Sequence, residues 1–437
     1  MKKQAFVWIF SETIFPSGSV SIIICKTEDR RIYPLARIQR IGVLGGAFDP
    51  VHTGHIRMAC GVMDTGLLDL LLVLPAGDPP YKRCVAGAED RWKMVVAACS
   101  ADQRLTPSRL EIDRSGKSFS ADTLKTLRNE YPEAELYYII GTDAFMNLRC
   151  WHQFKALLPL CRFLVCPRLP AMDKQALDRE IRYLSSLGAK VDFIPVTPVP
   201  VSSSEIRASL AEGILPSSLD CSIQEYCSCK GLYGLPGKLD HIDLWIEKLF
   251  ASLKPARFAH SLSVALTARR LAQLHGLNPL KAEQAGLLHD CAKCLPLREM
   301  QRIATENALT SDRSFLENSS LLHSIVGARV ASETYGMDDP EVLEAIAFHN
   351  TGNAGMSRLA MCVCLADSIE PHRGYYPGLE QVRELSLVSL ERSLLMSLES
   401  TAEYVRSRGL YLHPRTKDTI LWLRTLPEVS GHPCQAK

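Results

Sequence analysis

Residues 41–55 read IGVLGGAFDPVHTGH, a short apolar run followed at once by glycines and then by polar residues. Residues 41–44 have the continuous apolar character of a buried strand, and a helix is predicted to begin near His55. A strand that ends in a glycine-rich turn before a helix is typical of the crevice where open parallel sheets bind ligands. The glycines let the backbone approach phosphate oxygens, and the helix start offers N–H groups to an anion.

The sequence up to about residue 201 alternates apolar runs with helical segments. Continuous apolar strands that alternate with helices predict a parallel sheet covered on both faces, an α/β doubly wound fold of Rossmann type. A Ser-rich helix start and a short further helix, reaching Tyr233, close this part. The predicted strands are 41–44, 67–74, 135–140, 162–166 and 190–194, and the predicted helices include 91–100 and 120–131.

The character of the sequence changes after Lys238, where apolar residues recur at helical spacing without any alternating strand pattern. This half is long enough to bury a core of its own, so it predicts an all-α domain. The predicted helical segments are 244–253, 262–274, 282–288, 326–330, 342–347, 359–365 and 385–398. The expected domains are an N-terminal extension of unknown role (1–37), the α/β domain (38–234), a linker (235–238) and the all-α domain (239–437).

Charge and cysteine content limit the classes of function. Fifty Lys and Arg residues against 48 Asp and Glu give a net charge of +2, which does not favour binding of nucleic acid through bulk charge. No run reaches the ~20 apolar residues of a membrane span. The odd count of 15 Cys is typical of reduced thiols, and the spacing of Cys221, Cys227 and Cys229 lacks the paired Cys-x-x-Cys of a zinc site. We expect a cytoplasmic protein with small-molecule partners and with neither nucleic-acid nor membrane partners.

Two imidazoles follow the glycine-rich turn, at His52 and His55. Imidazoles at this place can donate hydrogen bonds to oxygens whose charge grows while a phosphoryl group is displaced. The turn lacks the Lys of a Walker-type loop. The pattern therefore predicts nucleotidyl transfer by positioning of the substrates, without a covalent enzyme intermediate.

The run GGAFDPVHTGH at 45–55 resembles the nucleotidyltransferase superfamily, and residues 38–234 resemble bacterial nicotinate mononucleotide adenylyltransferases. The likeness extends to VSSSEIR (201–207), SFSADTL (118–124) and the segment 141–151. It implies transfer of AMP from ATP to nicotinate mononucleotide, a step of NAD biosynthesis, with Mg²⁺ held mostly by the triphosphate. The resemblance implies His52, His55 and Arg207 as catalytic residues; Gly45, Gly46, Ala47, Phe48, Ser203, Ser204 and Arg207 as ATP-binding residues; and Phe119, Ser120, Asp143 and Trp151 as residues that bind nicotinate mononucleotide.

Two residues depart from the pattern of that family. Phe119 stands where Tyr is usual, which removes a hydroxyl, and Tyr81 stands where His is usual, which leaves the polar role of its loop open.

The helical half contains an adjacent His289 and Asp290 in the run AGLLHD at 285–290. Neighbouring residues of a helix point about 100° apart, so both reach one metal only where the helix borders a pocket. Imidazole and carboxylate donors suit iron, manganese or zinc. Further candidate ligands are His260, His323, His349 and Asp367.

This order of His, His-Asp, two His and Asp resembles the HD superfamily of metal-dependent phosphohydrolases, and residues 239–437 resemble bacterial HD-domain symmetrical bis(5'-nucleosyl)-tetraphosphatases. The matching stretches are HDCAK (289–293), HSIVGA (323–328), HNTG (349–352) and ADSIEPHR (366–373). The likeness implies a divalent metal, with iron as the first expectation, that activates a water to split diadenosine tetraphosphate into two ADP. The implied metal ligands are His260, His289, Asp290 (also catalytic) and Asp367, while Arg257, His323, His349 and Arg373 would hold ADP, the polyphosphate or a second metal.

The sequence as a whole predicts a bifunctional enzyme, and two alternatives stay open. The transferase could adenylylate another phosphomonoester such as phosphopantetheine, although Trp151 and the segment at Ser120 argue against it. The HD half could be a non-hydrolytic nucleotide sensor, although a complete set of metal ligands disfavours that role. The oligomeric state is not predicted.

Overall fold

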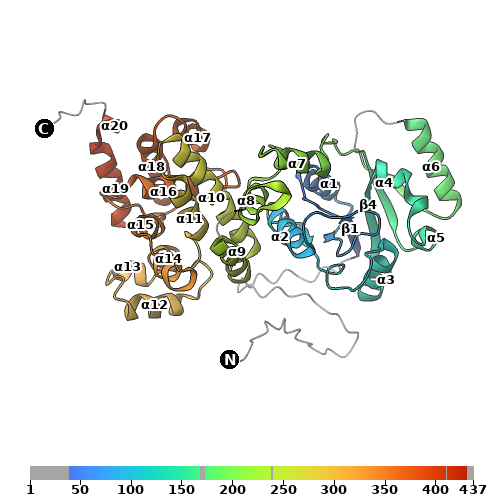
Figure 1. Ribbon diagram of the computed structural model, residues 1–437, viewed down its shortest axis with the longest axis horizontal. Helices are drawn as coiled ribbons and strands as arrows, with labels where there is room; N and C mark the ends of the chain where they lie inside the picture. Colours follow the sequence, from blue (N-terminus) through green and yellow to red (C-terminus); the bar gives the residue numbers. More distant parts are fainter. Residues whose placement is uncertain (1–38, 168–172, 238–239, 410, 431–437) are drawn as a thin grey trace.

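The structure is a computed structural model that describes residues 39–167, 173–237, 240–409 and 411–430. It consists of a unit built on a parallel sheet and a helical unit that follow one another along the longest axis (Figure 1). This arrangement confirms the predicted doubly wound α/β fold followed by an all-α domain. The predicted extension 1–37 and residue 238 of the predicted linker lie outside the described residues.

The sheet of the first unit has six strands in the order β3-β2-β1-β4-β5-β6, and every neighbouring pair is parallel. The chain moves outward from β1 to β3 on one side and from β4 to β6 on the other, so the strand order reverses between β1 and β4. Ligands of open parallel sheets bind at such a reversal. The strands are β1 (Arg40–Gly46), β2 (Leu70–Pro75), β3 (Leu105–Pro107), β4 (Glu135–Gly141), β5 (Arg162–Cys166) and β6 (Lys190–Phe193).

Strand β3 is the one strand of this sheet that the sequence did not predict. It has three residues, Leu105–Pro107, of which only the first is fully buried, so it offers no apolar run. Its pairing with β2, Leu71 opposite Leu105, comes from the sheet rather than from its own sequence.

Helices cover both faces of the sheet (Figure 1). Successive strand residues point to opposite faces, so Ile41 and Val43 pack in one apolar core with Leu124, while Leu44 packs in the other with Val62. The helices of this unit are α1 (Thr53–Asp64), α2 (Ala88–Cys99), α3 (Ser120–Glu130), α4 (Thr142–Met146), α5 (Phe154–Leu157), α6 (Lys174–Ser186), α7 (Ser203–Ala211) and α8 (Cys221–Lys230), with 3-10 turns η1 (Leu148–Cys150) and η2 (Leu232–Gly234).

The second unit is helical over its described residues. The predicted segment 385–398 is not one helix, because α17 ends at Ser386 and α18 begins at Leu390, where Oγ of Ser389 caps the new helix by accepting from Arg392 N–H. The helices are α9 (Asp240–Ser252), α10 (Pro255–Leu274), α11 (Pro279–Leu288), α12 (Leu297–Glu306), α13 (Arg313–Leu316), α14 (Ser319–Tyr335), α15 (Pro340–Phe348), α16 (Arg358–Ile369), α17 (Leu379–Ser386), α18 (Leu390–Ser407), α19 (Pro414–Thr425) and α20 (Pro427–Ser430).

The two units meet along α8, which lies between α2 of the first unit and α10 of the second (Figure 1). Tyr226 of α8 and Phe258 of α10 are fully buried in one continuous apolar cluster. Nζ of Lys93 on α2 donates to Oε2 of Glu247 on α9 at 2.6 Å, which adds an ion pair across the junction. The domains are therefore packed against each other. Among the described residues, every helix is too short or too polar to cross a bilayer.

Candidate functional site

A cavity of about 900 Å³ lies at the carboxyl end of the sheet, beside the reversal between β1 and β4. The structure brings all the residues predicted for the transferase site into the lining of this one cavity. They are Gly45, Gly46, Ala47, Phe48, His52, His55, Phe119, Ser120, Asp143, Trp151, Ser203, Ser204 and Arg207.

The two histidines of the glycine-rich turn are oriented by backbone N–H groups. Nδ1 of His52 accepts from Gly54 N–H at 3.2 Å, and Nδ1 of His55 accepts from the N–H of His52 at 3.3 Å. A neutral imidazole that accepts on Nδ1 carries its proton on Nε2, so both rings are set as Nε2–H donors. The ring centroids lie 3.7 Å apart, and both residues line the cavity.

Two glycines of the cavity wall pack closely against neighbouring side chains. A Cβ added to Gly45 would meet the hydroxyl oxygen of Tyr138 at 2.9 Å, and one added to Gly54 would meet Cε1 of His52 at 3.1 Å. Any larger residue at these two positions would crowd Tyr138 or His52, so the turn requires glycine there.

Arg207 reaches the glycine-rich turn from α7. Its Nη1 donates to the carbonyl oxygen of Asp49 at 2.7 Å, and its Nη2 donates to Oγ of Ser204 at 3.2 Å. Oγ of Ser203 donates to the carbonyl oxygen of Pro50 at 3.0 Å. These bonds hold the second predicted ATP segment against the first and leave a guanidinium in the cavity wall.

Aromatic side chains line the other end of the cavity. Trp151 meets Tyr138 edge to face, with centroids 5.8 Å apart, and Phe119 stacks on His152 at 4.1 Å. Tyr81, which replaces the usual His, accepts from the backbone N–H of His152 at 2.6 Å through its hydroxyl. The Tyr81 hydroxyl therefore connects two loops of the cavity through a hydrogen bond.

The sequence did not single out Asp49 and Glu111, which line the cavity, or Arg91, which bonds to the backbone of its loops. The guanidinium of Arg91 is buried and donates to the carbonyls of Ala76 and Gly77, at 2.6 and 3.0 Å, and to two further backbone carbonyls. The carboxylate of Asp49 accepts from two backbone N–H groups and a tyrosine hydroxyl. Burial raises the pKa of Glu111, which lines the cavity. Asp49 stood inside the quoted motif, whereas the other two carry no local sequence signal.

The second group of predicted residues meets in the helical unit, between α10, α11, α14, α15 and α16. His289 and Asp290 follow directly after α11 and are buried, and Nε2 of His289 lies 3.4 Å from Oδ2 of Asp290. Nε2 of His260 lies 3.0 Å from Oδ1 of Asp367 and 3.9 Å from Oδ2 of Asp290. Ligand atoms of His260, His289 and Asp367, and separately of His289, Asp290 and His349, lie within 4.8 Å of one another.

The remaining predicted residues surround this cluster. Nε2 of His323 lies 3.1 Å from Oδ1 of Asp290 and 3.1 Å from Nε2 of His349. Nη1 of Arg257 donates to Oδ2 of Asp290 at 2.7 Å, and Nη1 of Arg373 lies 3.5 Å from Oδ1 of Asp367. All eight residues predicted for the HD site are therefore brought together.

The chemistry of this cluster fits a divalent metal ion. Nδ1 of His289 donates to the carbonyl of Gly286 and Nδ1 of His349 donates to the carbonyl of Ile346, each at 2.7 Å. These bonds leave Nε2 as the lone-pair atom in both rings, the arrangement usual for metal-binding histidines. Among the described residues, Nε2 of His289 is buried without a hydrogen-bond partner. Ligands directed at a cation account for such atoms.

The charges of the cluster are set by burial and by close neighbours. Burial opposes ionisation of Asp290 and Asp367, but the adjacent histidines hold the pKa of both carboxyls well below the ordinary value. Burial and neighbouring histidines lower the pKa of His349 to about 3, so it is neutral at pH 7. Burial lowers the pKa of His260 as well, but hydrogen bonds to Asp367 and Glu370 outweigh it and raise the pKa to about 9. A metal must therefore displace a proton from His260.

Two residues of this site carried no predicted role. Oε1 of Glu370 lies 3.2 Å from Nδ1 of His260 and can hold that ring with Nε2 toward the cluster. Nζ of Lys293 lies 3.1 Å from Nε2 of His323. Both lie in stretches that resemble the HD family, at 366–373 and 289–293. The sequence alone did not mark a glutamate or a lysine there as part of the site.

Comparison with known proteins agrees with this division. The Cytidylyltransferase-like family model matches residues 43–209, and the HD domain model matches residues 257–372. A protein of Mycoplasma genitalium named "Probable nicotinate-nucleotide adenylyltransferase/Ap4A hydrolase" is 27% identical over 375 residues, which are 84% of this chain and 99% of the relative.

Two further proteins are similar to part of this chain. A "Probable nicotinate-nucleotide adenylyltransferase" of Synechococcus sp. (strain JA-3-3Ab) is 36% identical over 195 residues, 43% of this chain and 93% of the relative. A solved structure from Clostridium acetobutylicum, titled as a predicted HD superfamily hydrolase involved in NAD metabolism, is 38% identical and covers 41% of this chain and 95% of its own, with a TM-score of 0.40. The chain therefore belongs, through its first domain, to the nicotinate-nucleotide adenylyltransferase family, and it carries an HD domain behind that first domain.

Proposed function

We propose that the chain is a bifunctional enzyme that adenylylates nicotinate mononucleotide and hydrolyses diadenosine tetraphosphate. The observation that carries the first activity is the pair of imidazoles set as Nε2–H donors in the cavity of the α/β domain. We assign this activity to residues 38–234 and the hydrolase to residues 239–437, joined by the linker 235–238, and we assign no role to 1–37.

In the proposed transfer, the triphosphate of ATP lies along residues 45–48, where the lack of side chains on Gly45 and Gly46 allows close approach. Arg207 opposes its charge, and Ser203 and Ser204 supply polar contacts. The 5'-phosphate of nicotinate mononucleotide attacks the α-phosphorus of ATP, the bond to the β-phosphate breaks, and pyrophosphate leaves. His52 and His55 donate to oxygens whose negative charge rises in this step. Mg²⁺ enters with the triphosphate as part of the substrate.

The acceptor is assigned from the aromatic end of the cavity. Trp151 and Phe119 offer flat surfaces for a pyridine ring, and Ser120 and Asp143 stand beside them for ribose and phosphate. The names of the single-domain relatives support the same acceptor.

An acceptor screen tests this assignment. The full chain is incubated with ATP, Mg²⁺ and each of nicotinate mononucleotide, nicotinamide mononucleotide and 4'-phosphopantetheine, and pyrophosphate release is followed. We expect the highest kcat/KM with nicotinate mononucleotide. A higher value with phosphopantetheine would replace the proposal with the other-acceptor alternative.

The second activity is supported by the imidazole–carboxylate cluster and by the name of the Mycoplasma relative. We propose His260, His289, Asp290 and Asp367 as the ligands of a divalent metal, with iron as the preferred ion. When bound, such an ion supplies an activated water nucleophile. Arg257, Arg373 and Lys293 lie where they can oppose the charge of a polyphosphate, and His323 and His349 complete the polar wall or hold a second ion.

The hydrolase is tested on the full chain loaded in turn with Fe²⁺, Mn²⁺ or Zn²⁺. We expect diadenosine tetraphosphate to give ADP as its sole nucleotide product, fastest with iron. Tight binding of the dinucleotide without any turnover under each metal would instead establish the sensor alternative. AMP and ATP as products would contradict symmetrical cleavage.

A further inference from the structure

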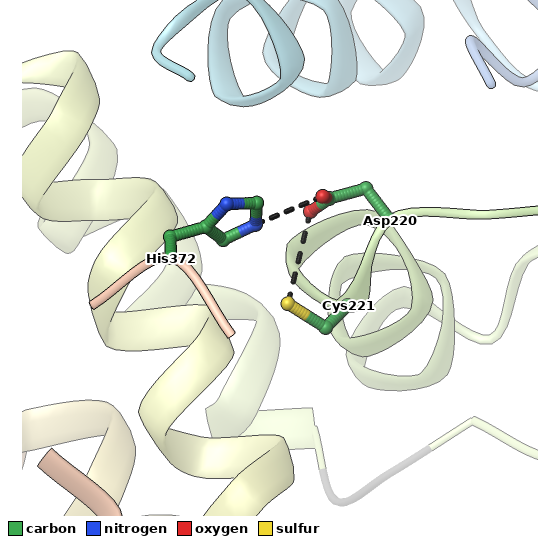
Figure 2. A group of neighbouring side chains, drawn as sticks. All are labelled: Asp220, Cys221 and His372. Carbon is green, nitrogen blue, oxygen red and sulfur yellow. Dashed lines mark hydrogen bonds and ion pairs between the residues drawn. The ribbon is translucent and has the colours of Figure 1, made fainter. Parts of the chain in front are cut away.

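Three metal-ligating side chains meet at the junction of the two domains, outside the residues assigned to either site (Figure 2). Asp220 caps α8 and Cys221 is its first residue, so both belong to the transferase domain. His372 follows α16 in the HD domain, and its Nε2 lies 2.8 Å from Oδ2 of Asp220. Sγ of Cys221 lies 3.8 Å from Oδ1 of the same carboxylate. One ligand atom of each residue lies within 4.8 Å of the other two.

We propose that Asp220, Cys221 and His372 bind a divalent metal ion of the zinc class, which joins the two domains. Thiolate sulfur, imidazole nitrogen and carboxylate oxygen are the three donor types that zinc takes in proteins, and three protein ligands leave a fourth position for water. The thiolate and the carboxylate together carry two negative charges, which a divalent cation balances. The thiolate distinguishes this site from the HD cluster, whose proposed ligands are nitrogen and oxygen.

Neighbouring groups orient two of these ligands. Oδ1 of Asp220 accepts from the N–H and the hydroxyl of Ser222, at 2.9 and 2.6 Å, which leaves Oδ2 directed at His372. Sγ of Cys221 lies 3.0 Å from Oγ of Ser263 on α10. Such outer contacts fix the direction of metal ligands.

The third ligand is fixed from the HD side. The backbone N–H of His372 donates to Oε2 of Glu370 at 2.8 Å, and the other oxygen of Glu370 contacts Nδ1 of His260. Glu370 therefore connects His372 to His260, a proposed ligand of the HD centre.

The cluster is also open to solvent and to exchange. The side chains of Asp220 and His372 are 28% and 35% exposed, so an ion can enter without unfolding of the junction. Without metal, the hydrogen bond to Asp220 raises the pKa of His372 to about 11. Metal uptake has to release this proton from His372.

The test is cobalt substitution of the full chain. Co²⁺ bound to a thiolate gives a charge-transfer band in the near ultraviolet, whereas Co²⁺ held only by nitrogen and oxygen gives none. The protein is reduced, stripped of metal and titrated with Co²⁺ and, in parallel, with Zn²⁺. The variants are Cys221→Ser, which keeps the size of the side chain and a polar contact to Ser263, and Asp290→Ala, which disables the HD centre. Cys60→Ser is the matched control, because Cys60 contacts Asp102 in the transferase domain.

We expect the charge-transfer band in the wild-type chain, in Asp290→Ala and in Cys60→Ser. In Cys221→Ser we expect the band to be absent, and the chain to bind one equivalent of Zn²⁺ fewer than wild type. A wild-type chain that shows no band at saturating Co²⁺ overturns the proposal. A band of undiminished strength in Cys221→Ser also overturns it, because the thiolate then belongs to another cysteine. Circular dichroism of each variant verifies that the fold is intact.

Discussion

Replacement of His52 separates a catalytic role from a structural one, because this side chain serves both. Its Nδ1 caps α1 by accepting from Gly54 N–H at 3.2 Å, and its Nε2–H is proposed to donate to the reacting phosphate. His52→Ala removes both interactions. His52→Ser keeps a capping oxygen at the helix start but is too short to reach a phosphate in the cavity.

The magnitudes of the two effects differ enough to be measured apart. Loss of one transition-state donor costs about 2.7–4 kcal/mol, which lowers kcat by about 10²–10³. Loss of the cap costs about 1 kcal/mol of stability, which lowers Tm by about 2–4 °C in a unit of this size. We expect both variants to lose activity by that factor and only His52→Ala to lose thermal stability.

The assay is steady-state formation of nicotinate adenine dinucleotide at saturating ATP, with calorimetry on the same samples. A kcat within about tenfold of wild type in either variant would refute the donor role of His52, since one tenfold step is only about 1.4 kcal/mol. Equal losses of Tm in both variants would refute the capping role.

Four further changes have defined outcomes. Asp290→Ala should empty the HD centre of metal and abolish ADP release, measured by metal analysis and product chromatography. Glu370→Gln should weaken metal binding about 10–100-fold in a competition titration, because the amide holds His260 less strongly than a carboxylate does. Gly286→Ala should cost about 1–3 kcal/mol by thermal unfolding, because its Cβ would lie 2.9 Å from a backbone carbon of α10. Tyr81→Phe should raise KM for nicotinate mononucleotide about 2- to 10-fold at unchanged kcat, because it loses one loop-tying hydrogen bond.

Three of these predictions have an outcome that would contradict them, and the metal titration of Glu370→Gln also has a control variant. Glu399→Gln, which alters an exposed ion pair with Arg424, should leave metal affinity unchanged. Metal affinity equal to wild type in Glu370→Gln would show that this carboxylate does not position His260. An unchanged Tm in Gly286→Ala would mean that α10 and α11 can move apart without loss of stability. A fall in kcat for Tyr81→Phe would indicate that the hydroxyl acts in the chemical step.

The sequence predicted five of the six strands, and the residues that it predicted for each site lie together in the structure. Strand β1, the glycine-rich turn and the start of α1 are continuous in the chain, so their local pattern predicts both the fold and the place of His52 and His55. The HD ligands come from separate helices, and their grouping followed from resemblance rather than from spacing.

Other features depend on contacts that form only in the folded chain and could not be predicted. The tautomers of the two histidines follow from backbone N–H groups in the folded turn. Cys221 gave no zinc signal because its partner His372 lies in the other domain and approaches only when α8 packs on α10. The buried Arg91, which ties loops by their carbonyls, looks in sequence like any surface arginine of a helix.

The measurement that tests two separate active sites most directly is a reciprocal assay of both reactions on metal-loaded wild type, His52→Ala and Asp290→Ala. We predict that His52→Ala loses dinucleotide formation and keeps ADP release, while Asp290→Ala shows the reverse. Loss of both reactions in either correctly folded variant would contradict the account, because the two chemistries would then depend on one shared centre.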